Sequence, residues 1–403
     1  MENRIKSVDK MKKIMKKYYL GAKYAKYFGK KIAWITSGGP VEPLIAIGII
    51  PVYPENHGAM IGASKIGAKL SEYAEGLGYS SDVCSYAKLD ITSSITRQSP
   101  IGGLPKPDML ICCNNICATV QKWYEIQARK FNVPLFIYDT PFCHVDLDDS
   151  AKKYLKSQTK EYIGFLEQVT KKKLDYDKMQ EVGKLSVKAM KIWQEVLDCA
   201  MQKPSPLTAF DAFIHLALIV TLRGKKIVVD YYQTLLEELK ERIKNKIPAV
   251  ENEKYRLLWD NLPIWYKMRW LSNTFAKYGG ALVADTYTQS WCSVVDYVDE
   301  NNFLETMGEA YARVYLNIGT DKMAESAIKL IDKYSIDGVV LHSNRSCKPY
   351  SFGQYDIARI IQEKRGIPTL FIEADMADER KFAQAQVENR ISSFMEVISQ
   401  LRN

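Results

Sequence analysis

Two short apolar runs in this 403-residue chain each lead to a cysteine where a buried strand would stop. The first occupies residues 107–117 and ends at Cys117, and the second occupies residues 337–347 and ends at Cys347. Four to eight apolar residues introduced by an acidic turn predict a strand buried on both faces. Ligands collect outside the carboxyl ends of strands in an open parallel sheet, so both cysteines are candidates for chemistry.

Cys84 is a third candidate thiol, because it stands in an irregular corner among Ser, Asp and Tyr residues rather than in a core pattern. If Cys84, Cys117 and Cys347 converge, three thiolates can hold a 4Fe-4S cluster and leave its fourth iron open to water or substrate. An open iron can act as a Lewis acid, whereas a fourth protein thiolate would make a closed electron-transfer site. Cys113 competes with Cys117 for this role if the register is shifted by one turn.

Ser37 and Glu55 are candidate polar groups at neighbouring strand ends. Ser37 closes a predicted strand at residues 31–37, beside two glycines that allow a ligand to approach the backbone closely. Glu55 follows a predicted strand at residues 49–53 and precedes a predicted helix at residues 59–77, where the helix dipole favours a carboxylate. We expect the two residues to hydrogen-bond a ligand and to move a proton, the alternative for Glu55 being a simple capping role.

The remaining cysteines and histidines predict packing rather than chemistry. None of the eight cysteines forms a Cys-x-x-Cys pair, which excludes zinc ribbons and ferredoxin-type runs and leaves only ligands gathered from distant strand ends. The adjacent Cys143 and His144 would point apart on a strand, which argues against a nucleophile and its base. The residues expected to pack are Cys112, Cys199, His215, Cys292 and His342.

The surroundings of the two cysteine runs repeat as well. Each run is followed by a helical pattern and then by another apolar strand, at residues 133–139 in the first copy and 367–373 in the second. The spacing between the copies is nearly constant from the acidic turn to this second strand. The repeat predicts an α/β fold of two related open parallel-sheet halves of the Rossmann or flavodoxin type, the alternative being a coincidence between common βαβ units.

Changes in pattern along the chain predict four segments. Residues 1–28 form an N-terminal helical arm that packs on the body or on a second subunit, and residues 29–145 form the first α/β domain. Long helical patterns predict a helical connector layer over residues 146–250, and α/β alternation resumes in a second domain over residues 251–403.

Composition excludes several classes of protein. The hydrophobic fraction of 47% and the charged fraction of 26% are those of an ordinary globular protein. The N-terminus lacks the apolar region of a signal peptide, and the most apolar run, at residues 213–222, is too short to span a bilayer, so we expect a cytoplasmic protein without a membrane segment. The net charge of +9 suits either a solvated lysine-rich surface or a polyanionic ligand such as coenzyme A. No basic and aromatic pattern indicates nucleic-acid binding, and no phosphate loop indicates ATP hydrolysis.

With these residues in view, the chain resembles the family of 2-hydroxyacyl-CoA dehydratases and class I benzoyl-CoA reductases. The resemblance is to the iron–sulfur subunit type that carries Cys-Cys-Asn-Asn-Ile-Cys, here at residues 112–117. The similar segments run in order through almost the whole chain. They are residues 36–38, 53–56, 82–86, 112–117, 344–347 and 373–378.

The resemblance implies a 4Fe-4S cluster held by Cys84, Cys117 and Cys347. It also implies a homologous second subunit with its own cluster and a separate ATP-dependent iron–sulfur activator that supplies a low-potential electron. In the dehydratases, the thioester carbonyl binds the open iron and becomes a ketyl radical, which expels the 2-hydroxyl group and loses a C3 proton. Ser37 would then contact the iron-bound oxygen, and Glu55 would transfer the proton.

Three functions follow as alternatives. We favour a subunit of an (R)-2-hydroxyacyl-CoA dehydratase, a lyase of anaerobic metabolism that forms a 2-enoyl-CoA. A benzoyl-CoA-type reductase subunit would use the same cysteines without losing water, and residues 54–58 favour that reading. The third is a homodimeric double-cluster iron–sulfur reductase or electron-transfer protein with no acyl-CoA substrate. The acyl group, the partner and the subunit that holds the substrate stay open.

Overall fold

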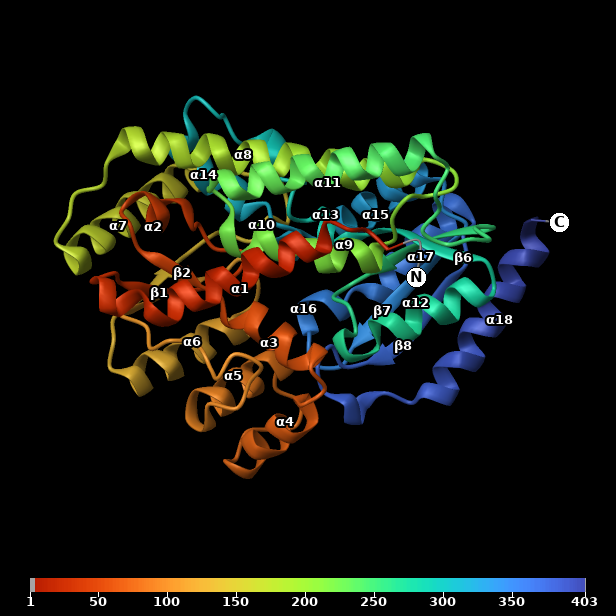
Figure 1. Ribbon diagram of the computed structural model, residues 1–403, viewed down its shortest axis with the longest axis horizontal. Coiled ribbons are helices and arrows are strands. Elements are labelled where there is room, and N and C mark those ends of the chain that lie inside the picture. The colour runs from red at the N-terminus through yellow and green to blue at the C-terminus, as the bar shows by residue number, and fades with distance from the viewer. Residues whose placement is uncertain (1–3, 403) are drawn as a thin grey trace.

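Two four-stranded parallel sheets form the framework of the chain, whose computed structural model describes residues 4–402 (Figure 1). The first sheet has the strand order β2-β1-β3-β4, and the second has the order β6-β5-β7-β8. The second sheet thus repeats the first, and all pairings are parallel, which confirms the prediction of an α/β fold with two related halves. The strands are β1 (Ile32–Ile35), β2 (Ile50–Val52), β3 (Met109–Cys113), β4 (Leu135–Tyr138), β5 (Tyr255–Asp260), β6 (Gly280–Asp285), β7 (Gly338–Asn344) and β8 (Thr369–Ala374).

An acidic residue before the third strand of each sheet makes the same contact in both halves. The Asp108 carboxylate accepts a hydrogen bond from the backbone N–H of Ile32 at 2.8 Å, where β1 begins. The Asp337 carboxylate accepts one from the N–H of Arg256 at 2.7 Å, near the start of β5. All residues of β3 and the first five of β7 are buried, as apolar strands of a helix-covered parallel sheet should be. The two halves therefore share turn chemistry as well as strand order.

Helices join the strands within each half. The first half contains α2 (Glu42–Ala46), α3 (Pro54–Ala63), α4 (Gly67–Gly76), α5 (Ser85–Thr96) and α6 (Ala118–Phe131). The second half contains α12 (Met268–Lys277), α13 (Thr286–Gln289), α14 (Phe303–Ala312), α15 (Thr320–Tyr334), α16 (Lys348–Ser351), α17 (Gln354–Arg365) and α18 (Gln384–Arg402).

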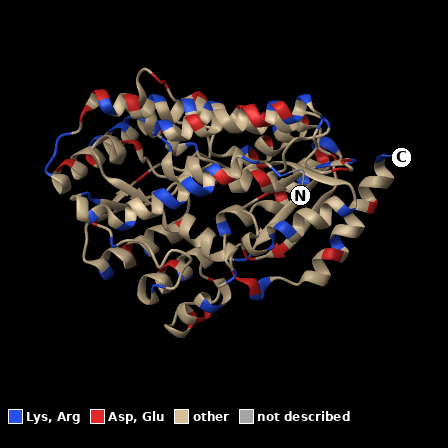
Figure 2. Cartoon of the chain, viewed as in Figure 1, with Lys and Arg blue, Asp and Glu red and all other residues tan. Residues whose placement is uncertain are grey.

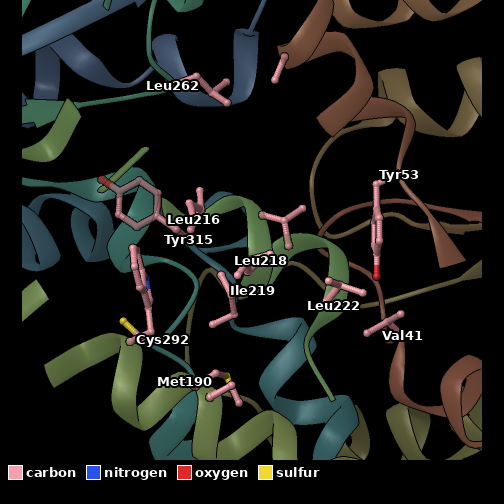
Figure 3. Close-up of a cluster of buried hydrophobic side chains, with 14 of the residues drawn as sticks. Val41, Tyr53, Met190, Leu216, Leu218, Ile219, Leu222, Leu262, Cys292 and Tyr315 are labelled. Atoms are coloured by element: carbon pink, nitrogen blue, oxygen red, sulfur yellow. The ribbon is translucent and has the colours of Figure 1, made fainter. Parts of the chain in front are cut away.

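A helical layer lies between the two sheets in sequence and contacts both halves. Two of its long helices, α8 and α11, pack side by side along one edge of the molecule (Figure 1). The short helix α10 carries core side chains, among them Leu218 and Ile219, between Tyr53 of the first half and Tyr315 of the second (Figure 3). The helices of this layer are α7 (Asp149–Thr170), α8 (Tyr176–Asp198), α9 (Ala209–His215), α10 (Ala217–Leu222) and α11 (Lys226–Lys244).

The N-terminal helix α1 (Val8–Tyr24) packs on the body of its own chain. Its buried face includes Met11 and Tyr18, and the Tyr18 hydroxyl donates to the carbonyl of Pro51 at 2.8 Å. The predicted arm at residues 1–28 therefore contains a helix, although residues 1–3 and 403 lie outside the described part of the chain. The predicted domain boundaries stay a prediction, and the strands of the two sheets fall inside residues 29–145 and 251–403.

One local prediction in the first half is wrong, and one helix there was not predicted. The helix predicted over residues 59–77 is divided into α3 and α4 by a turn at Lys65, whose φ of 60° is left-handed and cannot continue a helix. The helix α5 was not predicted, because polar residues fill its buried face and remove the apolar periodicity. Lys88 pairs with Glu75 at 2.9 Å, and Asp90 accepts from the Trp123 indole at 2.8 Å, so these polar side chains are satisfied inside the fold. Among residues 4–402, no helix combines the length and apolarity needed to cross a bilayer.

Candidate active site

One cavity collects all five residues that the sequence singled out for chemistry. It has a volume of about 180 Å³ and is lined by side chains from both halves. The first half contributes Ser37, Glu55, Cys84 and Cys117, and the second contributes Cys347. The carboxyl-terminal ends of strands from two separate sheets therefore supply one site, as the repeat predicted.

Each candidate thiol stands immediately before a helix. Cys84 precedes α5, Cys117 precedes α6 and Cys347 precedes the single turn of α16. The first backbone N–H groups of a helix have no intrahelical partner, and they favour negative charge. The sequence folds in this way at Cys117 and Cys347 because each follows a buried strand and a polar corner in the same repeated unit.

Burial opposes ionisation of these thiols. Burial and the neighbouring Cys117 raise the pKa of Cys84 to about 12, although the N–H groups of Ala87 and Tyr86 act in the opposite direction. Burial also raises the pKa of Cys347 well above its usual range, and the thiols of Cys84 and Cys117 add to the rise. All three cysteines line the same cavity. Three thiolates in this place require bound positive charge, and coordination to a metal deprotonates a thiol outright.

The chemistry of the donor set fits a 4Fe-4S cluster, because cysteine thiolates are the protein ligands of such clusters. The ligands of a four-iron cluster surround a group larger than a single ion, so three separated thiols around a cavity are the pattern that such a cluster needs. Cys84, Cys117 and Cys347 match that pattern, and no other described cysteine lines this cavity.

Cys113, the competitor of Cys117, does not reach the cavity. It lies in β3 and is fully buried, and its backbone N–H donates to the Thr36 hydroxyl at 3.0 Å. Cys112 is likewise buried within the strand. The structure therefore puts Cys117, and not Cys113, on the cavity wall.

Glu55 is held loosely at the cavity wall. It lies in the first turn of α3, where Oε1 accepts from the backbone N–H of Ser37 at 3.2 Å and Oε2 accepts from the Tyr124 hydroxyl at 3.3 Å. Its remaining exposure faces the cavity. Burial raises the pKa of Glu55 to about 7, while the Ser37 N–H and the Tyr124 hydroxyl act to lower it. A carboxyl group with this pKa can give or take a proton near neutral pH.

A buried charged network beneath Ser37 was missed in the sequence. The Arg223 guanidinium donates to the carbonyls of Ser37 and Gly39 at 3.3 and 2.6 Å and lies 3.5 Å from the Glu42 carboxylate. Glu42 also accepts from the Tyr311 hydroxyl at 2.7 Å. The network fixes the loop that carries Ser37. The available signal was a lone arginine that directly follows the most apolar run of the chain, at residues 213–222.

The cavity wall away from the thiols is mostly apolar. Side chains of α8, α14 and the segment after α13 form this part of the wall, and Arg223, the one arginine or lysine among the described lining residues, is already paired with Glu42. The apolar lining includes Met190, Trp291, Val294, Val298, Phe303, Met307 and Leu316. An uncharged ligand group suits this region, because a carboxylate would be desolvated there without a free partner.

The other cysteines and histidines occupy packing positions. The Cys292 thiol lies 3.1 Å from the Gln194 side-chain oxygen, and the Cys143 thiol lies 3.2 Å from the carbonyl of Ala312. His215 Nδ1 lies 2.5 Å from the Tyr231 hydroxyl, and His342 Nδ1 lies 2.6 Å from the carbonyl of Leu262. The described lining of the cavity includes no histidine. Cys199 is buried at the end of α8, and His144 lies beside Gly319.

Comparison with known proteins identifies the family of this chain. The model of the family described as 2-hydroxyglutaryl-CoA dehydratase, D-component, matches residues 36–398, which include all five residues collected in the cavity. The chain belongs to this family. The resemblance noted in the sequence is therefore confirmed.

Several members of the family align with nearly the whole chain. The (R)-2-hydroxyisocaproyl-CoA dehydratase alpha subunit of Clostridioides difficile is 35% identical, over 96% of this chain and 95% of its own length. The (R)-phenyllactyl-CoA dehydratase alpha subunit of Clostridium sporogenes is 33% identical, over 93% of this chain and 91% of its own. One of the benzoyl-CoA reductase subunits of Thauera aromatica is 30% identical, over 93% and 90%. The family thus contains both dehydratase and reductase subunits.

Proposed function

We propose that this chain is the iron–sulfur subunit of an (R)-2-hydroxyacyl-CoA dehydratase, which removes water from its substrate to give a 2-enoyl-CoA. The observation that carries the proposal is the meeting of three thiols, a carboxyl group and a serine around one cavity. The similarity to dehydratase alpha subunits supports the same reaction class.

The residues of the chain have separable roles in this proposal. Cys84, Cys117 and Cys347 would hold the 4Fe-4S cluster. When bound, the cluster supplies a Lewis-acidic iron and the low-potential electron that elimination from an unactivated position requires. Ser37, fixed by Arg223, orients the thioester oxygen. The Glu55 carboxylate takes the proton from C3 of the substrate, so that the proton and the departing 2-hydroxyl group together make one water.

The proposal includes two protein partners and a compartment. The relatives are named as alpha subunits, which supports a homologous second subunit and a heterodimer. A separate ATP-dependent iron–sulfur activator would deliver the electron. We also propose a cytoplasmic location, because eight free thiols suit a reducing compartment.

A benzoyl-CoA-type reductase is the second candidate function, favoured by the similarity to the benzoyl-CoA reductase of Thauera aromatica. His57, in the segment that favoured this reading, is fully buried and is not among the residues that line the cavity. The dehydratase proposal, by contrast, uses only residues that line the cavity.

The test is a reaction catalysed by the complete system. The chain, purified anaerobically with its second subunit, is combined with the activator, ATP, a reductant and (R)-2-hydroxyacyl-CoA thioesters. We expect loss of one water, detected by mass spectrometry of the thioester product. Reduction of benzoyl-CoA without water loss would favour the second candidate. Absence of both reactions in a preparation with a full complement of iron would contradict the enzyme proposals.

A further inference from the structure

The acidic segment at residues 373–378, where β8 ends, has no role in the chemistry assigned above. Charged residues of both signs stand close together between β8 and α18 (Figure 2). Asp375, the first residue after β8, is only 3% exposed, whereas Glu373 is exposed. A buried carboxylate requires a partner of opposite charge or several hydrogen bonds, because desolvation of an ion is costly.

Asp375 obtains its hydrogen bonds from two directions. Its Oδ1 accepts from the backbone N–H groups of Ala377 and Asp378 at 2.8 and 2.9 Å, in a local turn of the kind that aspartate favours. Its Oδ2 accepts from the hydroxyl of Ser346 at 2.5 Å, in the segment that follows the neighbouring strand β7. A local turn needs only one carboxylate oxygen, so the contact with Ser346 requires a different explanation.

Ser346 connects this carboxylate to two of the three thiols. It directly precedes Cys347 in the chain, and its hydroxyl oxygen accepts from the backbone N–H of Ser85 at 3.2 Å. Ser85 in turn directly follows Cys84, and the two serine hydroxyl groups lie 3.3 Å apart. Asp375 does not line the cavity itself. It is therefore one serine away from proposed ligands that come from both halves.

No neighbouring cation neutralises this carboxylate. Within residues 4–402, no ion pair includes Asp375, and the arginines nearest to it in the network are paired elsewhere, Arg345 with Glu373 and Arg380 with Asp378. A buried charge without a counterion is weakly screened by solvent and salt, so its field reaches neighbouring groups.

The field of Asp375 acts on the thiols. Burial is the main cause of the raised pKa of Cys84 and of Cys347, and the charge of Asp375 adds to the rise of the pKa in each. A charge that opposes ionisation of these thiols also opposes the addition of an electron to a group that they hold, because both steps add negative charge. The potentials of iron–sulfur clusters depend on such surrounding charge.

We propose that Asp375 is a positioning residue that keeps the reduction potential of the cluster low, as a fixed negative charge held behind Cys84 and Cys347 by Ser346. This inference rests on the proposed function, because it takes the three cysteines as ligands of a 4Fe-4S cluster. Reduction adds one electron, supplied by the proposed activator or by a chemical reductant, to a group that three thiolates already make anionic. Asp375 disfavours this addition, so the electron is passed on to the thioester more readily.

The test is a redox titration, followed by EPR, of the chain purified anaerobically with its second subunit. Asp375→Asn removes the charge and keeps the shape, so the ratio of reduced to oxidised cluster at a fixed poise should rise about tenfold, which is about 59 mV for one electron. Glu373→Gln is the matched control, because it removes the same charge from an exposed position of the same segment. It should change the ratio by less than about twofold. Equal shifts in the two variants would overturn the proposal.

Ser346→Ala provides the second readout, which also decides the matter if Asp375→Asn loses its iron. This variant keeps the charge of Asp375 and removes the hydroxyl donor that partly offsets it, so the ratio of reduced to oxidised cluster should fall. A role limited to holding the loop would move both variants in the same direction, because loosened ligands admit water in either case. An upward shift in Ser346→Ala, or no shift, would overturn the proposal.

The outcomes separate this inference from the proposed function. If Asp375→Asn keeps its iron and its potential is unchanged, the inference fails and the dehydratase proposal stands. If the potentials of both variants move as expected but the complete system removes no water from any thioester, the role of Asp375 stands and the dehydratase proposal fails. A wild-type protein that stays free of iron after reconstitution would overturn both.

Discussion

In each half, the second strand along the chain leads to a carboxyl group, but the two groups are held differently. Glu55 follows β2, and its two hydrogen bonds measure 3.2 and 3.3 Å. Asp285 ends β6, where its carboxylate accepts from the backbone N–H and the hydroxyl of Thr288, each at 2.5 Å. Burial raises the pKa of both carboxyl groups to about 7. A perturbed pKa therefore does not distinguish the two groups, whereas cavity access and loose bonding do.

The comparison extends to the other strand ends. β1 leads to Ser37 at the cavity, whereas its counterpart β5 leads to Asp260, which is tied to Gln354 at 2.6 Å and to Thr286 at 2.8 Å inside the second half. Only the third strands of the two sheets, β3 and β7, lead to the same kind of side chain at the cavity, the thiols of Cys117 and Cys347. A repeated scaffold has thus kept one ligand position in common and uses the remaining strand ends of the second half for internal structure.

The largest predicted effect tests whether the second half is needed for the cluster. Cys347→Ala removes one of three proposed ligands, so iron should fall from about four per chain to near zero in anaerobically purified protein, together with all dehydratase activity. Cys113→Ala should keep its iron, because Cys113 does not line the cavity. Iron and sulfide analysis with EPR checks both variants. An iron content that persists in Cys347→Ala and disappears in Cys113→Ala would reverse the ligand assignment.

The next prediction separates the two carboxyl groups. Glu55→Gln should lower kcat by about 10²- to 10⁴-fold with little change in Tm, because it removes the proton acceptor and keeps the shape. Asp285→Asn should lower the Tm and leave kcat per folded molecule within about threefold, since its partner is Thr288 and the cost is that of a damaged cap. In the wild type, activity should rise with pH through about 7 as Glu55 loses its proton, and Glu55→Gln should lose this step. A loss of kcat shared equally by both variants would argue against a specific role for Glu55.

The sequence was sufficient to predict features that depend on residues close together in the chain. Strand ends, acidic turns and the repeated cysteines predicted the two sheets and the thiols that meet between them, because apolar runs and turn residues act over a few positions. The network of Glu42, Arg223 and Tyr311 was not predictable in this way. Its members are far apart in the chain, and only the packed fold shows which buried charges are paired. For the same reason α5 was missed, because its buried polar residues are satisfied by distant partners.

A smaller effect is expected at the contact between the halves. Gly67 begins α4, and a Cβ at this position would lie 1.8 Å from the carbonyl oxygen of Ala377, which follows β8. Gly67→Ala should therefore reduce the free energy of unfolding by about 1–3 kcal/mol, as overpacking does. Gly76→Ala is the matched control in the same helix, because a Cβ there meets nothing within 4 Å. It should be neutral or stabilise by up to about 1 kcal/mol. Denaturant unfolding measures the unfolding free energies of both variants. Equal values would mean that α4 and the segment after β8 can move apart at this contact without cost.

The smallest predicted effect concerns the acidic turns that the halves have in common. Asp108 and Asp337 each accept a backbone N–H from the neighbouring central strand and each form one partly exposed ion pair, with Lys26 at 3.2 Å and with Arg402 at 3.3 Å. Alanine at either position should cost about 1 kcal/mol of unfolding free energy, nearly all from the hydrogen bond, because exposed ion pairs contribute little.

The two sites lie in different sheets and share no partner, so the double variant should lose the sum of the single effects. Denaturant unfolding of the two single variants and the double variant measures this directly. Equal and additive losses would show that the two acidic turns make equal contributions to the unfolding free energy as well as the same contact. A loss confined to Asp108→Ala would instead mean that only the first half depends on this turn, and the repeat would then be one of shape alone.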